Sequence, residues 1–146
     1  TPTINSEEGV LYAEISALAN DGVGRLIMLS DGTNSNRVFM GYWTLSNEIR
    51  VLMQVGSATQ IFSGTTSYDI LDFNKLAFKY KENDFALWVN GVEVITDTSG
   101  ITFPIGTLTQ LDFDSNGSAF FYGRTKDVKI YDKALTDEQL TELTTI

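Results

Sequence analysis

The 146-residue sequence contains neither cysteine nor histidine. Without cysteine there are no disulfide bonds and no thiol nucleophiles, and without histidine there are no imidazole bases and none of the usual zinc or copper ligands. Any bound metal would therefore have to be held by oxygen atoms. A domain of this length does not require disulfide bonds, so the lack of cysteine does not identify a redox compartment.

Basic residues are few compared with acidic ones. The sequence contains ten lysines and arginines but nineteen aspartates and glutamates, which gives a net charge of -9 and a pI near 4.3. This charge repels phosphate backbones and anionic lipid surfaces at long range, so nucleic acid is not an expected partner. The longest apolar runs have the length of a strand, so membrane insertion is not expected either.

Apolar and polar residues alternate in short stretches separated by turn residues, a pattern typical of antiparallel strands. With 42% hydrophobic residues the chain predicts one core. Residues 1–8 are interpreted as a linker remnant or an edge segment, and residues 9–146 as a single domain. A start at Thr1 also suggests a piece of a parent multidomain protein. Strands are expected over residues 9–18, 25–30, 37–44, 48–55 and 60–63.

The strand expected at residues 37–44 carries apolar groups on both faces. Val38, Met40 and Tyr42 lie on one face, and Phe39 and Trp43 lie on the other. This arrangement predicts a strand inside a sandwich whose outer face is partly covered or used for binding.

Two successive tight hairpins are predicted from residue 75 to about residue 93. Asn83-Asp84 and Asn90-Gly91 are their expected turns. In the first hairpin, this turn makes Lys79 oppose Trp88.

The second turn makes Trp88 also oppose Glu93. With these registers the apolar partners fall on one face, and a slip of one residue would mix the faces. Trp88 is therefore predicted to lie on the polar face, between Lys79 and Glu93.

The C-terminal part predicts one more strand at residues 107–114, a closing strand, and a short helix. Thr136 as N-cap places Gln139 at the third helical position, a capping box, and the helix is expected to end near Leu143. The regular spacing of short strands indicates an all-β fold, an antiparallel β-sandwich of jelly-roll type with one short C-terminal helix.

The segment from Gly123 to Leu140 (Gly-Arg-x-Lys-Asp-Val-Lys-Ile-Tyr-Asp-Lys-Ala-Leu-Thr-Asp-Glu-Gln-Leu), together with Leu-Trp-Val-Asn-Gly at residues 87–91, resembles laminin-G-like, concanavalin A-like lectin/glucanase domains. It looks most like those at the ends of bacteriophage tail and other virion structural proteins. The resemblance implies a concanavalin A-like jelly roll and an extracellular or virion-associated setting. Because that family contains lectins, carbohydrate-binding modules, glycosidases and adhesive domains, the resemblance does not choose a function.

Catalysis is not expected. A glycosidase needs two carboxylates that flank the scissile bond, and the related glucanases carry them as a Glu-x-Asp-x-x-Glu run. The sequence has no such run. Asp112 and Asp114 share one strand face, but no glutamate follows them.

No cofactor is required, but a calcium site is a second possible use of these acids. Asp112, Asp114 and Asn116 offer hard oxygen ligands, and several relatives of the resembled family bind Ca²⁺ at the rim of the sandwich. The alternative is that they are solvated polar residues at a strand end. A weaker candidate set is Asp21, Asp31 and Asp69.

Sugar binding needs an aromatic plate with polar groups beside it, and Trp88 between Lys79 and Glu93 fits that description. The alternative is that the tryptophans are core or interface aromatics. The row of Lys75, Lys79 and Lys81 predicts either a solubilising edge or the border of a site for an acidic polysaccharide. Further candidates for the binding surface, expected on strands that neighbour the hairpins, are Trp43, Tyr42, Arg50 and Gln54, with Phe120 and Tyr122 as secondary ones.

The sequence thus predicts a non-catalytic carbohydrate-binding module that recognises a polysaccharide or a cell-surface glycan. The alternative is a structural or host-adhesion module of a phage tail or other virion protein that binds no sugar.

Overall fold

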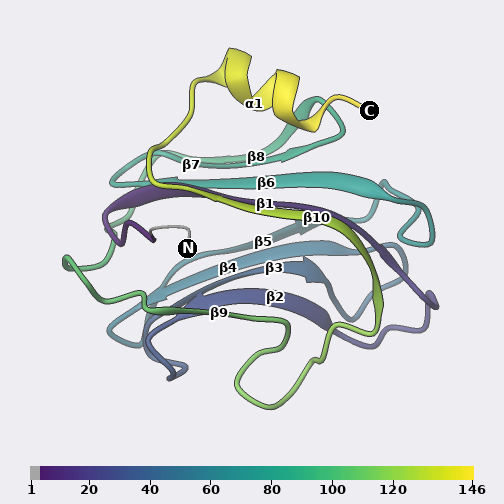
Figure 1. The fold of residues 1–146 in the computed structure, drawn as a ribbon, viewed down its shortest axis with the longest axis horizontal. Coiled ribbons are helices and arrows are strands. Elements are labelled where there is room, and N and C mark those ends of the chain that lie inside the picture. The colour runs from purple at the N-terminus through teal and green to yellow at the C-terminus, as the bar shows by residue number, and fades with distance from the viewer. Residues whose placement is uncertain (1–3) are drawn as a thin grey trace.

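The computed structural model describes residues 4–146 and consists of two five-stranded antiparallel sheets that pack face to face (Figure 1). Sheet I has the order β10-β1-β6-β7-β8, and sheet II has the order β5-β4-β3-β2-β9. The predicted β-sandwich with one C-terminal helix is confirmed. The elements are β1 (Glu8–Ala17), β2 (Arg25–Ser30), β3 (Arg37–Tyr42), β4 (Ile49–Val55), β5 (Ala58–Thr65), β6 (Asn74–Lys81), β7 (Phe85–Val89), β8 (Val92–Asp97), β9 (Gln110–Asp112), β10 (Gly123–Tyr131) and α1 (Asp137–Thr144).

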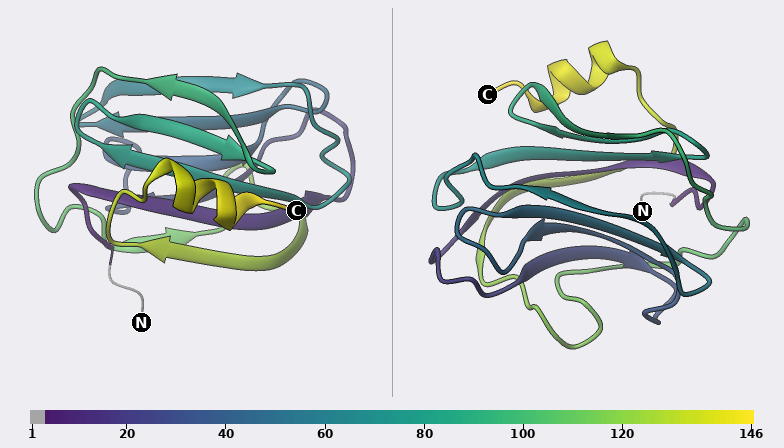
Figure 2. Two further views of the ribbon diagram at one scale, coloured as in Figure 1. Left: turned by 90° about the horizontal axis from the view of Figure 1, so that it is seen from above. Right: turned by 180° about the vertical axis from the view of Figure 1, so that it is seen from behind.

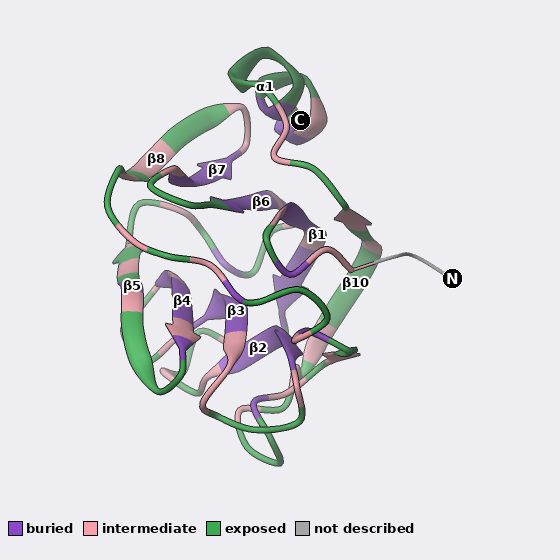
Figure 3. Ribbon diagram, turned by 90° about the vertical axis from the view of Figure 1, so that its left-hand side faces the viewer, coloured by how far each residue is buried: buried purple, intermediate pink, exposed green. Residues whose placement is uncertain are grey.

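The core lies between the two sheets and is built from one face of each strand. Leu11, Ala13 and Ile15 of β1 point into it, as their alternation predicts. The hydroxyl of Tyr42 in sheet II donates to the carbonyl of Ile15 in sheet I at 2.8 Å, and burial raises the pKa of Tyr42 to about 12. Figure 3 shows that the central strands are buried, whereas the edge strands β5, β8 and β10 are largely exposed or half-buried.

The N-terminal segment before β1 packs against the domain where it is described. Of the predicted linker or edge segment 1–8, residues 1–3 lie outside the described residues. Ser6 is buried, and its hydroxyl accepts a hydrogen bond from the backbone N–H of Leu108 at 2.9 Å. Within residues 4–146 no helix has the length and apolar character needed to cross a membrane.

The register of the first predicted hairpin was wrong by two residues. The turn is centred on Glu82 and Asn83, and the N–H of Asp84 bonds the carbonyl of Lys81 at 2.8 Å. Two residues are the side-chain period of a strand, so the shift changes the partners but not the faces.

In this corrected register Trp88 pairs with Ala77, and Lys79 pairs with Ala86. The second hairpin has the predicted turn, because Asn90 and Gly91 both adopt positive φ and Trp88 opposes Glu93.

Helix α1 begins at the predicted capping box of Thr136 and Gln139 and lies across the outer face of sheet I (Figures 1 and 2). Its Leu140 is fully buried, and such burial contributes about 1.5–3 kcal/mol. The cluster beneath it contains Tyr12, Ala77 and Trp88. Helix α1 therefore shields these residues of the outer face of sheet I from solvent.

The strand predicted at residues 107–114 is shorter than expected, because only Gln110–Asp112 pair with β2. The chain then leaves the sheet at residues 113–122, called here the 113–122 loop. Figure 1 shows this loop hanging below sheet II before it returns as β10. It turns at Asn116 and Gly117, both with positive φ. The loop gives the outer face of sheet II a side wall.

Candidate functional site

The residues predicted to bind sugar do not form one surface. Trp88 and Lys79 belong to sheet I, whereas Trp43 and Gln54 lie on sheet II or at its end. The prediction that these strands are neighbours was wrong, because the chain crosses from one sheet to the other between β5 and β6.

The expectation that Trp88 lies on a solvent-facing polar surface was also wrong. Its side chain is only 7% exposed, because α1 covers it. Lys79 is equally buried, and its ammonium pairs with the carboxylate of Asp84 at 2.7 Å. Glu93 is exposed on edge strand β8. These residues offer a ligand no open aromatic plate.

The predicted lysine row shares this outer face of sheet I. Lys75 donates from Nζ to the carbonyl of Thr145, just after α1, at 3.0 Å. Lys81 lies 4.0 Å from the carboxylate of Glu8. The row therefore borders the helix rather than a groove.

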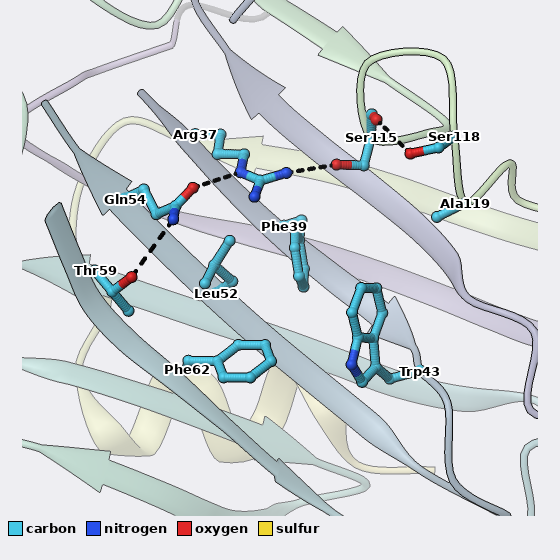
Figure 4. A pocket seen from close by; sticks show the side chains of 10 residues that line it. All are labelled: Arg37, Phe39, Trp43, Leu52, Gln54, Thr59, Phe62, Ser115, Ser118 and Ala119. Carbon is cyan, nitrogen blue, oxygen red and sulfur yellow. Dashed lines mark hydrogen bonds between the residues drawn. The ribbon is translucent and has the colours of Figure 1, made fainter. Parts of the chain in front are cut away.

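The outer face of sheet II carries an open groove of about 390 Å³, within the size range of small-molecule sites (Figure 4). Strands β3, β4 and β5 form its floor and one side, and the 113–122 loop forms the other side. The sequence-predicted Trp43 and Gln54 are among its residues, and Arg50 lies just beyond Phe62. The groove is lined by Arg37, Phe39, Trp43, Leu52, Gln54, Thr59, Phe62, Ser115, Ser118 and Ala119.

Three aromatic rings form a continuous row along this groove, called here the aromatic row: Phe39, Trp43 and Phe62. The rings of Phe39 and Trp43 stack with centroids 5.3 Å apart and planes at 28°. Phe62 meets Trp43 edge to face at 6.4 Å. Each end carries a cation, because Arg37 lies 5.4 Å from the ring centre of Phe39 and Arg50 lies 4.4 Å from that of Phe62.

The row exists because of strand periodicity and one glycine. Phe39 points outward because it alternates with the core residues Val38 and Met40. A Cβ at Gly24 would lie 3.3 Å from the ring of Trp43. A glycine there leaves room for the indole beside the chain that enters β2.

Arg37 connects the floor of the groove to the loop. Its Nε donates to Oε1 of Gln54 at 2.8 Å, and its Nη1 donates to Oγ of Ser115 at 2.7 Å and to Oδ1 of Asn34 at 3.3 Å. Burial lowers the pKa of Arg37, but an arginine stays charged at neutral pH. The guanidinium is thus fixed at one end of the groove (Figure 4).

A second arginine holds the far end of the 113–122 loop. Nε of the buried Arg25 donates to the carbonyl of Tyr122 at 2.8 Å, and the N–H of Leu26 donates to the carbonyl of Ala119 at 3.1 Å. Arg25 also pairs with Asp21 at 2.9 Å, and the hydrogen bonds that Asp21 accepts from Arg25 and from the N–H of Val23 lower the pKa of Asp21. The loop is therefore tied to sheet II at both ends.

Tyr122, a secondary candidate from the sequence, lies outside the groove lining and is 61% exposed. Its ring centre is 6.2 Å from that of Phe120, which is also exposed. The pair forms an exposed aromatic surface that is separate from the groove lining.

Two of the three predicted calcium ligands have hydrogen-bond partners within the protein. Asp112 accepts from the amide of Gln110 at 2.7 Å, and Asn116 donates its amide to Asn34 at 2.6 Å. In the part of the chain that the structure describes, no group of three or more acidic side chains could hold a metal ion. Calcium binding by Asp112, Asp114 and Asn116 stays a prediction. A calcium-induced rise in Tm that Asp112→Asn abolishes would support it.

Sequence reasoning missed several groove residues. Arg37 has the same strand parity as Phe39 and Trp43, so the period-two pattern could have placed it on this face. Ser115, Ser118 and Ala119 carry no such signal, because their position depends on a loop that folds back over the sheet.

Among curated proteins, none matches this sequence significantly. Several solved structures share its fold. The CBM40 of the Ruminococcus gnavus IT-sialidase is 15% identical with a TM-score of 0.75, over 95% of this chain and 83% of that chain. Domain 4 of AbnA, an extracellular arabinanase of Geobacillus stearothermophilus in complex with arabinotriose, is 16% identical with a TM-score of 0.73, over 98% and 68%. The carbohydrate-binding module CBM66 of Bacillus subtilis is 10% identical with a TM-score of 0.59, over 88% and 78%.

The sequence itself matches a known family over most of its length. Residues 11–141 fit the concanavalin A-like lectin/glucanases superfamily, in its laminin G form. The matched stretch runs from β1 into α1 and includes every residue that lines the groove. The resemblance based on residues 87–91 and on the closing segment is thereby confirmed. The chain belongs to the concanavalin A-like lectin/glucanases superfamily.

Proposed function

We propose that this domain is a non-catalytic carbohydrate-binding module and that the groove on sheet II is its binding site. The observation that carries the proposal is the aromatic row on the outer face of sheet II, where Phe62 is 49% exposed and Trp43 is half-buried beside the buried Phe39. Polar side chains flank the row. Aromatic faces bind the apolar face of a sugar ring, and nearby amides and hydroxyls bond its hydroxyl groups. Gln54, Thr59 and Ser118 offer such groups in the groove.

The absence of acids from the groove supports a binding role over hydrolysis. Hydrolysis of a glycosidic bond needs a pair of carboxylates, and none of the ten groove residues is acidic. Two of the similar folds support the proposal further, since one was solved with arabinotriose and another is itself named a carbohydrate-binding module.

A polysaccharide screen with a matched pair of variants tests this function. Phe62 and Phe120 are exposed to a similar extent, 49% and 44%, but only Phe62 lines the groove. In affinity electrophoresis against soluble neutral and acidic polysaccharides, Phe62→Ala should lose retardation and Phe120→Ala should keep it. Equal retardation of both variants would contradict the site, and no retardation of the wild-type protein by any glycan would contradict the function.

The exposed pair of Phe120 and Tyr122 favours a second candidate function, a structural or host-adhesion module of a phage tail or other virion protein that binds no sugar. Such an aromatic surface is suited to protein contacts. An extracellular or virion-associated setting and a parent multidomain protein belong to either proposal. Light scattering separates them, because self-assembly that Phe120→Ala abolishes, without glycan binding, would favour the second.

A further inference from the structure

The arginines of sheet II differ in their electrostatic partners. Arg25 pairs with Asp21, and Arg50 pairs with Glu48. Arg37 forms no salt bridge with any residue from 4 to 146. The groove therefore contains a half-buried guanidinium whose charge the described protein leaves uncompensated.

The partners of Arg37 orient the guanidinium without neutralising it. Its hydrogen bonds go to the amides of Gln54 and Asn34 and to the hydroxyl of Ser115, all of which are uncharged. In Figure 4 no dashed line reaches its second terminal nitrogen, Nη2. A guanidinium held in this way keeps donor capacity for an anion, and its planar fork matches the geometry of a carboxylate.

The surroundings strengthen this charge. The protein as a whole carries a net charge of -9, yet the groove has no acidic residue that would compete for Arg37. The apolar rings and Leu52 beside it keep water away from one side, and charges interact more strongly where water is partly excluded. The groove is a local positive site on an acidic molecule.

We propose that the groove selects glycans that bear a carboxylate, with Arg37 binding the carboxylate while the aromatic row binds an adjoining sugar ring. This inference rests on the proposed sugar-binding function and names the class of sugar. It moves the expected acidic-polysaccharide site from the lysines beside α1 to Arg37 on the opposite sheet. The uncharged partners of Arg37 keep it in position when no ligand is bound.

The test compares acidic polysaccharides with their own neutral forms. Polygalacturonate, alginate and hyaluronan are each used intact and after chemical reduction of the carboxyl groups, together with neutral xylan and arabinan. The wild-type protein should bind at least one intact acidic glycan about tenfold or more tightly than its reduced form, the effect expected of a charge-assisted hydrogen bond. Rising salt should weaken that binding.

Arg37→Gln and Arg124→Gln each remove one positive charge, and comparing them localises the effect. Arg37→Gln should lose the preference for the intact glycan, and Arg37→Lys should restore part of it. Arg124→Gln, at an exposed position on β10 of sheet I, should keep the preference in full. Equal circular dichroism spectra and Tm values for the variants show that their folds are intact.

The outcomes separate the two proposals. Binding of neutral or reduced glycans with no preference for the intact forms would overturn the carboxylate inference and leave sugar binding in place. Equal binding of dextran sulfate would also overturn it, because a general attraction to polyanions would then suffice. A protein that binds none of the glycans would contradict both proposals.

Discussion

The two tryptophans of this protein should give opposite results when each is replaced by alanine. Trp88 is 93% buried beneath α1, whereas Trp43 lies half-buried in the aromatic row. We expect Trp88→Ala to lower stability and leave glycan affinity unchanged. We expect Trp43→Ala to lower affinity and to change stability less.

The size of the Trp88 effect follows from its surroundings. Removing a buried tryptophan costs about 3–5 kcal/mol. The indole Nε1 of Trp88 has no hydrogen-bond partner among the described residues, so no hydrogen bond is lost with it and the lower end applies. At about 2–4 °C for each kcal/mol in a chain of this size, Tm should fall by about 6–12 °C. Trp88→Phe, which keeps a ring and removes the unpaired N–H, should cost much less.

The assay uses the fact that the chain has only two tryptophans. In Trp88→Phe the remaining fluorescence comes from Trp43 and should change when glycan binds. In Trp43→Phe it comes from Trp88, should be blue-shifted by burial, and should not respond to glycan. Trp43→Ala should weaken binding about tenfold or more, as for a central aromatic of an interface. Loss of glycan affinity in Trp88→Ala below its Tm, with affinity kept in Trp43→Ala, would refute the placement of the site.

Three further predictions concern the elements that support the groove and the helix. Ser115→Ala removes the acceptor of the Arg37 Nη1 hydrogen bond and should speed hydrogen exchange in residues 113–122, measured by mass spectrometry, while exchange in β1 stays the same. Thr136→Ala removes the capping box of α1 and should cost about 1 kcal/mol, seen as a fall in Tm of about 2–4 °C; an unchanged Tm would show that the cap does not hold the helix. Because the pKa of Asp21 is lowered in the folded state, its pairing with Arg25 stabilises the protein above the unfolded value near 3.8, and this stability is lost as pH falls through the folded pKa. Asp21→Asn should therefore lower Tm at pH 6 and lower it less at pH 2.

Much of the fold could be predicted from the sequence because short-range chemistry determines it. Period-two alternation gave the strands and their core faces, as in Leu11 and Ile15 of β1. The capping box at Thr136 gave the start of the helix, and Asn90-Gly91 gave a hairpin turn. Each of these signals lies within a few residues of the element that it predicts.

The site was harder to predict because it depends on tertiary packing. The sequence shows that Trp43 and Trp88 both lie opposite the core face of their strands, but it does not show which sheet α1 covers. Helix α1 covers sheet I and leaves sheet II uncovered. Trp88 is therefore a buried structural residue, whereas Trp43 stays half-exposed to solvent. The groove wall at Ser115 and Ala119 depends on contacts with residues about 80–90 positions away in the chain. The local sequence pattern around these residues does not indicate such long-range contacts.

The way the 113–122 loop is attached has a consequence for how such a domain can change its ligand. Arg37 holds Ser115, and Arg25 holds Tyr122, so both attachment points stay on the sheet that forms the groove floor. Between them the loop tip has open space at Gly117, where a Cβ would meet nothing within 4 Å, while Asn116 and Ser118 keep hydrogen bonds to Asn34 and Ser115. Insertions at Gly117 can thus lengthen the loop without disturbing either sheet. This is the natural position for a library that retunes the proposed sugar recognition on a fixed aromatic floor.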